Sequence, residues 1–102
     1  MMVLDEGHSY ELKPFVEQGC ESEQPQILNF MKRVAGKVVF GGTTNEEVFK
    51  MLINRMQYLQ TKLPCRENAI VITKLEESLM WLESRTQKRI EQGVETKDVS
   101  HK

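Results

Sequence analysis

Three basic side chains gather near the end of the sequence. Arg85, Lys88 and Arg89 are spaced i, i+3 and i+4, so on a helix they share one side. Arginine can hold two phosphate oxygens in a fork, whereas the ammonium group of lysine attracts them only as a point charge. The cluster therefore predicts a site for a phosphate-bearing anion. The alternative is an exposed last helical turn whose cations complement the helix dipole.

Two further side chains are candidate ligand contacts. Asn68 falls on the same helical stripe as Ile72 and Leu75, where an apolar residue is expected. A polar group there needs a partner, so Asn68 either caps the second helix, closes the turn, or faces a ligand. Tyr58 lies on the flank of the first helix. It is either an ordinary wall residue or a ring on which a base stacks.

The histidines and cysteines do not support catalysis or metal binding. His8 and His101 lie near opposite ends of the sequence, which leaves no credible Ser-His or Cys-His arrangement. Cys20 and Cys65 lack CxxC spacing and are too few for a zinc site or a disulfide framework.

The glutamate pairs at 46–47 and 76–77 invite comparison with helical nucleotide pyrophosphohydrolases, whose metals are held by paired carboxylates. Such a site needs acids at i, i+3 or i+4 that project into one cavity. Neither pair is followed by an acid at that spacing. We therefore predict a protein that is not an enzyme and that uses neither a metal nor a cofactor.

The elements that must position these residues are two amphipathic helices. Thr44 and Glu47 have the spacing of a capping box, so the first helix is expected over 45–62, and Pro64 ends it. The second helix is expected from Arg66 to about Gln92, with Gly93 as its stop. A connection of about three residues makes the two helices antiparallel neighbours. The second, longer helix then overhangs the first and carries the basic cluster close to the start of the first helix.

The expected seam between the helices uses one apolar stripe from each. The stripe on the first helix is predicted to contain Val48, Leu52, Met56, Leu59 and Leu63. On the second helix, Trp81 and Ile70 lie far from the seam and form a second apolar patch. That patch either packs beneath the N-terminal strands or forms an oligomer interface.

The N-terminal part is expected to be less regular. Residues 1–26 form an acidic segment with at most one short strand, around Tyr10 to Phe15. Residues 27–42 are expected to form a β-hairpin or ribbon around Ala35 and Gly36. The predicted fold class is thus α+β. A small N-terminal ribbon precedes a helical hairpin over 44–93 and a tail over 94–102, as one domain that assembles as an oligomer.

Charge and composition narrow the function classes. The 102 residues carry a net charge of −1, and the positive excess lies in the second part of the chain. The excess is weak for duplex DNA but ample for a small anion. No apolar run approaches the roughly 20 residues that span a bilayer, and no signal peptide is recognised, so we expect a cytoplasmic protein.

The stretch GTTNEEVFKMLINRMQYLQ, with PCRENAIVITKLEESLMWLESRT and RIEQGVE after it, resembles the phage Thoeris anti-defence sponge family. That family shares its helical hairpin with anti-CBASS sponges. The resemblance implies a non-catalytic phage protein that sequesters cyclic nucleotide immune signals in the cytoplasm of the infected bacterium. The expected ligands are glyco-cyclic ADP-ribose isomers, and some members also hold cyclic oligonucleotides at a separate pocket. Dimers or hexamers with pockets between subunits are implied as well.

The resemblance also implies individual ligand contacts. They are Arg33 of FMKRV, Tyr58 of RMQYLQ, Asn68 of CRENA and Arg85 of SRT, with Arg89 as a further phosphate contact from the basic cluster. The chain departs from many members in reading VET at 94–96 where they read VEGT. The rival interpretation is a small helical module of a phage that binds a protein or DNA. A second helix of some 27 residues argues against a helix-turn-helix.

Overall fold

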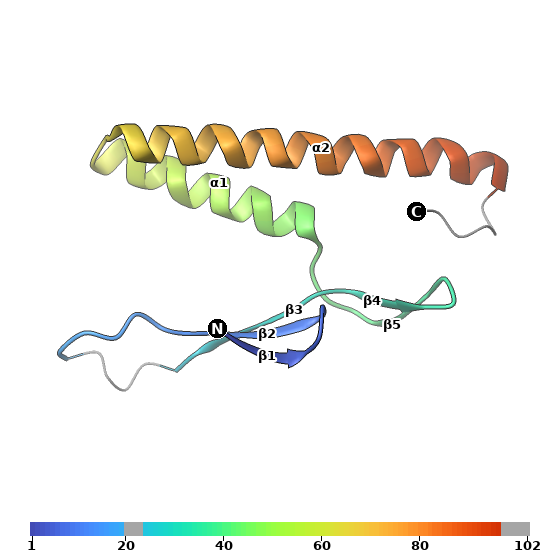
Figure 1. Ribbon diagram of the computed structural model, residues 1–102, viewed down its shortest axis with the longest axis horizontal. Helices are drawn as coiled ribbons and strands as arrows, with labels where there is room; N and C mark the ends of the chain where they lie inside the picture. Colours follow the sequence, from blue (N-terminus) through green and yellow to red (C-terminus); the bar gives the residue numbers. More distant parts are fainter. Residues whose placement is uncertain (20–23, 97–102) are drawn as a thin grey trace. The chain divides into compact units, whose positions relative to one another are not determined.

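The computed structural model describes residues 1–19 and 24–96, with only the backbone of 93–96, and it confirms the α+β class. Five antiparallel strands precede two helices (Figure 1). The chain divides into two compact units, residues 1–44 and the chain from Asn45 onward. Each unit is described by itself.

The first unit contains a three-stranded sheet of β1 (Met2–Asp5), β2 (Ser9–Leu12) and β3 (Gln26–Asn29), in the order β1-β2-β3. β2 pairs with both neighbours, and Tyr10 lies opposite Val3 and Leu28. The Tyr10 ring meets Phe30 edge to face, with 5.9 Å between the ring centroids. We expected at most one short strand before residue 27, but both β1 and β2 lie there.

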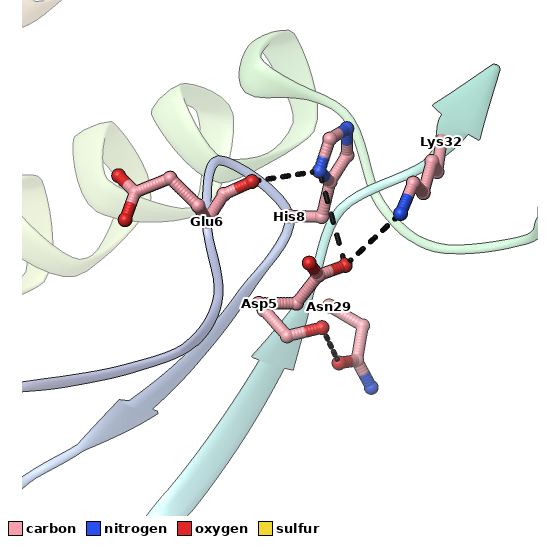
Figure 2. A network of polar contacts seen from close by, with 6 residues as sticks. Asp5, Glu6, His8, Asn29 and Lys32 are labelled. Atoms are coloured by element: carbon pink, nitrogen blue, oxygen red, sulfur yellow. Dashed lines mark hydrogen bonds and ion pairs between the residues drawn. The ribbon is translucent and has the colours of Figure 1, made fainter. Parts of the chain in front are cut away.

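A polar cluster lies at the end of this sheet (Figure 2). The carboxylate of Asp5 accepts a hydrogen bond from Lys32 Nζ at 3.4 Å and lies 3.9 Å from His8 Nδ1. The same nitrogen is 2.9 Å from the backbone oxygen of Glu6. Because a carbonyl oxygen only accepts, Nδ1 carries the proton. These contacts tie the β1–β2 turn to the first residue of β4.

The expected ribbon over 27–42 is only partly correct. β4 (Lys32–Val34) and β5 (Lys37–Phe40) do form a hairpin, but residues 27–29 belong to β3 and pair with β2 instead. The loop of the hairpin has only two residues, Ala35 and Gly36, which both have positive φ, 53° and 79°, as a type I′ turn requires. Val34 and Lys37 pair directly beside this turn, and β4 has three residues.

Glycine is required where the chain leaves β5. The backbone amide of Thr43 donates to Asn29 O at 2.8 Å, and that of Met31 donates to Thr43 O at 2.9 Å. These two bonds draw Gly42 so close to β3 that a Cβ there would lie 2.5 Å from Asn29 O. Gly41, its neighbour, has no such atom within 4 Å.

The second unit is a hairpin of α1 (Asn45–Lys62) and α2 (Arg66–Thr96). α1 has the bounds that were predicted. The expectation that Gly93 ends α2 was wrong, because the helix continues to Thr96. Glycine inside a helix costs only about 1 kcal/mol relative to alanine, so a long helix can include one. Figure 1 shows α2 continuing well past the start of α1.

The stripe that α1 turns toward α2 agrees in part with the predicted one. Val48, Met56 and Leu59 are half-buried as expected, whereas Leu63 is 78% exposed and Leu52 38% exposed. Phe49 and Ile53, which were not in the predicted stripe, are half-buried as well. No side chain of the described residues is fully buried, so the hairpin leaves much apolar surface uncovered.

We predict that Gly42→Ala destabilises the first unit. The added methyl group would collide with the backbone of Asn29, and overpacking of this kind costs about 1–3 kcal/mol. Hydrogen exchange at the Met31 and Thr43 amides measures the loss. Gly41→Ala is the matched control and should leave exchange almost unchanged. Equal protection in the two variants would contradict the close approach.

Candidate ligand-binding site

The turn between the helices is closed by side chains that the sequence analysis did not single out. The carboxamide of Gln60 pairs with both backbone groups of Cys65. Its Nε2 donates to Cys65 O and its Oε1 accepts from Cys65 N, each at 3.1 Å. Cys65 immediately precedes α2, and its Sγ accepts from the backbone amide of Asn68 at 3.4 Å. Cys65 thus occupies the capping position and Gln60 closes the turn.

Asn68 consequently has neither of the two structural roles that were considered for it. It is half-buried in the first turn of α2, on the side that faces α1. Within the described part of the chain, no hydrogen bond of its side-chain amide is found. A half-buried amide next to a turn that is already closed is available to bind a ligand.

Tyr58 is 54% exposed on α1, and its ring has a cation beside it. Lys62 Nζ lies 5.4 Å from the ring centroid, which is within the range of a cation–π contact. The ring is therefore accessible for stacking, and a base that stacked on the same face would take the place of the ammonium group.

The basic residues belong to α2 and lie near the first turn of α1, at the end of the hairpin away from the turn. Arg85 is exposed and Arg89 half-buried on α2. Between them Thr86 donates from Oγ1 to Oε2 of Glu46 at 2.8 Å, a bond that joins the first turn of α1 to α2. This bond brings together two residues that are 40 positions apart in the sequence. It fixes the register of the hairpin at the end that carries the arginines.

Glu46 shows the electrostatic effect of this arrangement. Its pKa is lowered below the ordinary value of 4.5, first by the Thr86 hydroxyl and then by a backbone hydrogen bond. Desolvation opposes the shift, and the charges of Arg85 and Arg89 add to it. Arg85 and Arg89 thus both lie near enough to Glu46 for their charges to act on its carboxylate.

The predicted residues are not all brought together within one chain. Asn68 and Arg85 are 17 positions apart on the same helix, a separation of about 26 Å. Arg33 lies in β4 of the other unit, where its Nη1 donates to Gly36 O at 3.3 Å. The hairpin therefore carries two separate groups, Asn68 beside the turn and the arginines at the overhang.

The sequence analysis missed Thr86 and considered Glu46 only as a metal ligand. Thr86 continues the apolar stripe of Leu79 and Leu82 at i+7 and i+4. A polar residue on that stripe is the same signal that identified Asn68, and it could have identified Thr86. The partner Glu46 could not have been found in this way, because its distance from Thr86 depends on the register of the turn.

A shallow groove also runs between the helices, with a volume of about 370 Å³. Ile53, Leu79 and Met80 supply its apolar surface, Glu76 and Glu83 contribute negative charge, and Lys50 contributes a positive charge. None of the predicted ligand contacts lines this groove. Two carboxylates against one ammonium group leave the groove with a net negative charge, which disfavours a phosphate group.

Within residues 1–19 and 24–96, no group of three histidines, cysteines or acids is placed to hold a metal ion. None of the helices found there is long and apolar enough to cross a membrane. Cys20 and His101 lie outside the described residues.

The fold and the charges define a small α+β protein whose helical hairpin carries a positive region at its open end. A family model described as the Acb2/Tad1 hairpin domain matches residues 31–87. The chain belongs to this family, which confirms the resemblance seen in the sequence. Arg33, Tyr58, Asn68 and Arg85 lie within the matched residues, and Arg89 lies just beyond them.

The chain is also similar to a named protein. It is 54% identical over 55 residues to Thoeris anti-defense 1 of Bacillus phage SBSphiJ7. The aligned stretch covers 53% of this chain but only 39% of that protein. The likeness thus spans about two fifths of the length of the relative.

We predict that Thr86→Val lowers the unfolding free energy by about 1 kcal/mol at pH 7, because a hydrogen bond to a partly solvated carboxylate is lost. A lowered pKa means that this stabilisation is complete above pH 4.5 and disappears as the pH falls through the folded-state pKa. The difference between the two proteins should therefore narrow in acid. Denaturant unfolding at fixed protein concentration measures it.

Thr73→Val, an exposed change on the same helix, is the control and should show no such pH dependence. A gap between wild type and Thr86→Val that stayed constant from pH 7 to pH 3 would contradict the assigned role of Glu46.

Proposed function

We propose that this protein is a phage anti-defence sponge, which binds a cyclic nucleotide immune signal and holds it without catalysis. The signals are glyco-cyclic ADP-ribose isomers, and cyclic oligonucleotides are candidate second ligands. Sequestration in the cytoplasm of the infected bacterium would starve the Thoeris effector. The observation that carries the proposal is that the family model matches the stretch of the chain that contains the four expected ligand contacts. These are Arg33, Tyr58, Asn68 and Arg85.

The chemistry of these side chains supports the proposal. The guanidinium groups of Arg85 and Arg89 would hold the phosphates, as forks that match phosphate oxygens. The exposed ring of Tyr58 would stack on the adenine, and the side-chain amide of Asn68 would bond a ribose or a base edge. Arg33 would add a further cation. None of these side chains is a nucleophile or a general base placed for hydrolysis.

The separation of about 26 Å between Asn68 and Arg85 supports a pocket built by two copies of the chain. Both residues can reach one small ligand only if the turn end of one hairpin lies against the open end of another. A sponge must also outcompete the effector, which calls for a dissociation constant of about 1 nM or below, roughly −12 kcal/mol. That affinity requires an enclosed ligand.

The exposed apolar side chains support assembly as well. Trp81 is 63% exposed and Ile70 42% exposed on α2, and Leu63 is 78% exposed at the turn. A homo-oligomer, either a dimer or a hexamer, would cover this surface. The rival proposal, a module that binds a partner protein or DNA, would use the same surface for a different chain. Binding of a small nucleotide without affinity for duplex DNA separates the two.

The function is tested directly by mixing the protein with a glyco-cyclic ADP-ribose isomer, removing free ligand, and heating the complex. Mass spectrometry should then recover the ligand unchanged and in stoichiometric amount. A hydrolysed product would indicate an enzyme. Failure of every candidate isomer to copurify would contradict the proposed function.

We predict that Arg85→Ala weakens binding of the isomer more than about tenfold, because a charge-assisted and bidentate phosphate contact is lost. Arg85 is exposed, so its removal should leave the melting temperature unchanged. Calorimetry gives both affinities. Lys74→Ala is the matched control, since it removes a charge from an exposed position of α2 far from the arginines. Unchanged affinity of Arg85→Ala would exclude Arg85 from the site.

We predict that Asn68→Ser keeps the stability but weakens ligand binding. Serine cannot reproduce the reach of the carboxamide or its paired donor and acceptor. Because Cys65 and Gln60 already provide the cap and the turn closure, little stability depends on the Asn68 side chain. Thermal melting and calorimetry on one preparation separate the two effects. Full binding by Asn68→Ser would remove Asn68 from the pocket.

A further inference from the structure

One acidic side chain stands beside the two arginines. Glu46 is half-buried in the first turn of α1, and its Oε2 accepts the 2.8 Å hydrogen bond from Thr86. Thr86 directly follows Arg85 and precedes Arg89 by three positions. The carboxylate therefore lies against the turn of α2 from which both arginines project.

Glu46 does not pair directly with either guanidinium group. Within residues 1–19 and 24–96, no ion pair is found between Glu46 and Arg85 or Arg89. The hydrogen bond to Thr86 holds the carboxylate in place, close enough for its charge to act on both arginines. The guanidinium donors consequently remain available to a ligand.

We propose that Glu46 is a built-in counter-ion of the Arg85–Arg89 pair, and that it sets how much negative charge the site accepts. This inference rests on the proposed function, in which the pair holds phosphate groups. Two guanidinium charges and one carboxylate leave a net charge of +1 on these three side chains, and Lys88 of the same cluster adds one more positive charge. Each further negative charge on a ligand is repelled by the fixed carboxylate, so ligands with few phosphates are favoured over ATP-like competitors.

The alternative role for Glu46 is purely structural, as a hydrogen-bond acceptor and as an acid at a helix N-terminus. Glu46→Gln separates the two roles. Glutamine keeps the size of the side chain and an oxygen for the Thr86 hydroxyl, but it removes the charge. Glu47→Gln is the matched control, because it removes the same charge from the same helical turn and keeps a residue suited to that position of a capping box.

The probes are inorganic pyrophosphate and ATP, with binding measured by calorimetry at low and at high salt. Glu46→Gln should bind pyrophosphate roughly fivefold more tightly than the wild type, and ATP by a larger factor. Glu47→Gln should change either affinity by less than about twofold, because the bond from Thr86 holds the carboxylate of Glu46, not that of Glu47, against α2. The gain from Glu46→Gln should shrink at high salt, where partly exposed charges are screened.

Glu46→Ala removes the charge and the hydrogen bond together and should show the same direction of change. Equal affinities of wild type and Glu46→Gln, an equal gain from Glu47→Gln, or no pyrophosphate binding by any variant would each overturn the counter-ion role. A gain for pyrophosphate in a protein that takes up no cyclic ADP-ribose isomer would instead contradict the proposed function and leave the counter-ion role standing.

Discussion

The two hydrogen bonds between the Gln60 carboxamide and the backbone of Cys65 determine the geometry of the helical hairpin. They fix the point at which α2 begins, after Pro64 has ended α1. Once the start of α2 is fixed, the helical rise determines which residues of α1 and α2 lie opposite each other, and Glu46 lies opposite Thr86. The overhang of α2, with Arg85 and Arg89 at its start, follows from the unequal lengths of the two helices.

A hairpin of two helices can cover only one side of each. Phe49, Ile53 and Met56 lie on the covered side of α1, yet even they are only half-buried. Hydrophobic burial is the main favourable term in folding, so a unit with so little of it depends on a further covering surface. In the proposed oligomer, stability and ligand enclosure would have a common origin, since a second copy of the chain would supply both.

The helices could be predicted from the sequence because their limits depend on local chemistry. Thr44 and Pro64 mark the bounds of α1 without any knowledge of the tertiary structure. The pairing of β3 with β2 could not be predicted in the same way, because it joins strands separated by a long connection. The exposure of Leu52 and Leu63 was missed for a related reason. Apolar periodicity does not say which neighbour covers a stripe.

The site could be predicted only in part. The arginine pair follows from helical spacing, and Asn68 from a polar residue on an apolar stripe. Their ligand roles, like those of Arg33 and Tyr58, remain predictions. Glu46 was considered in the sequence only as a metal ligand, and its contact with Thr86 emerges from the register of the whole hairpin. The spacing of residues along one helix cannot predict a contact between positions that are 40 residues apart.

The position of the closed turn also has a kinetic consequence. Contacts near Gln60 and Cys65 join residues only five positions apart, so closing the chain there has a small entropic cost. The pairing of the helices is then expected to proceed from the turn outward, and the bond between Glu46 and Thr86 would form last. By the same reasoning it would open first in local unfolding. The end of the hairpin that carries Arg85 and Arg89 would thus be the part whose structure a bound ligand stabilises most.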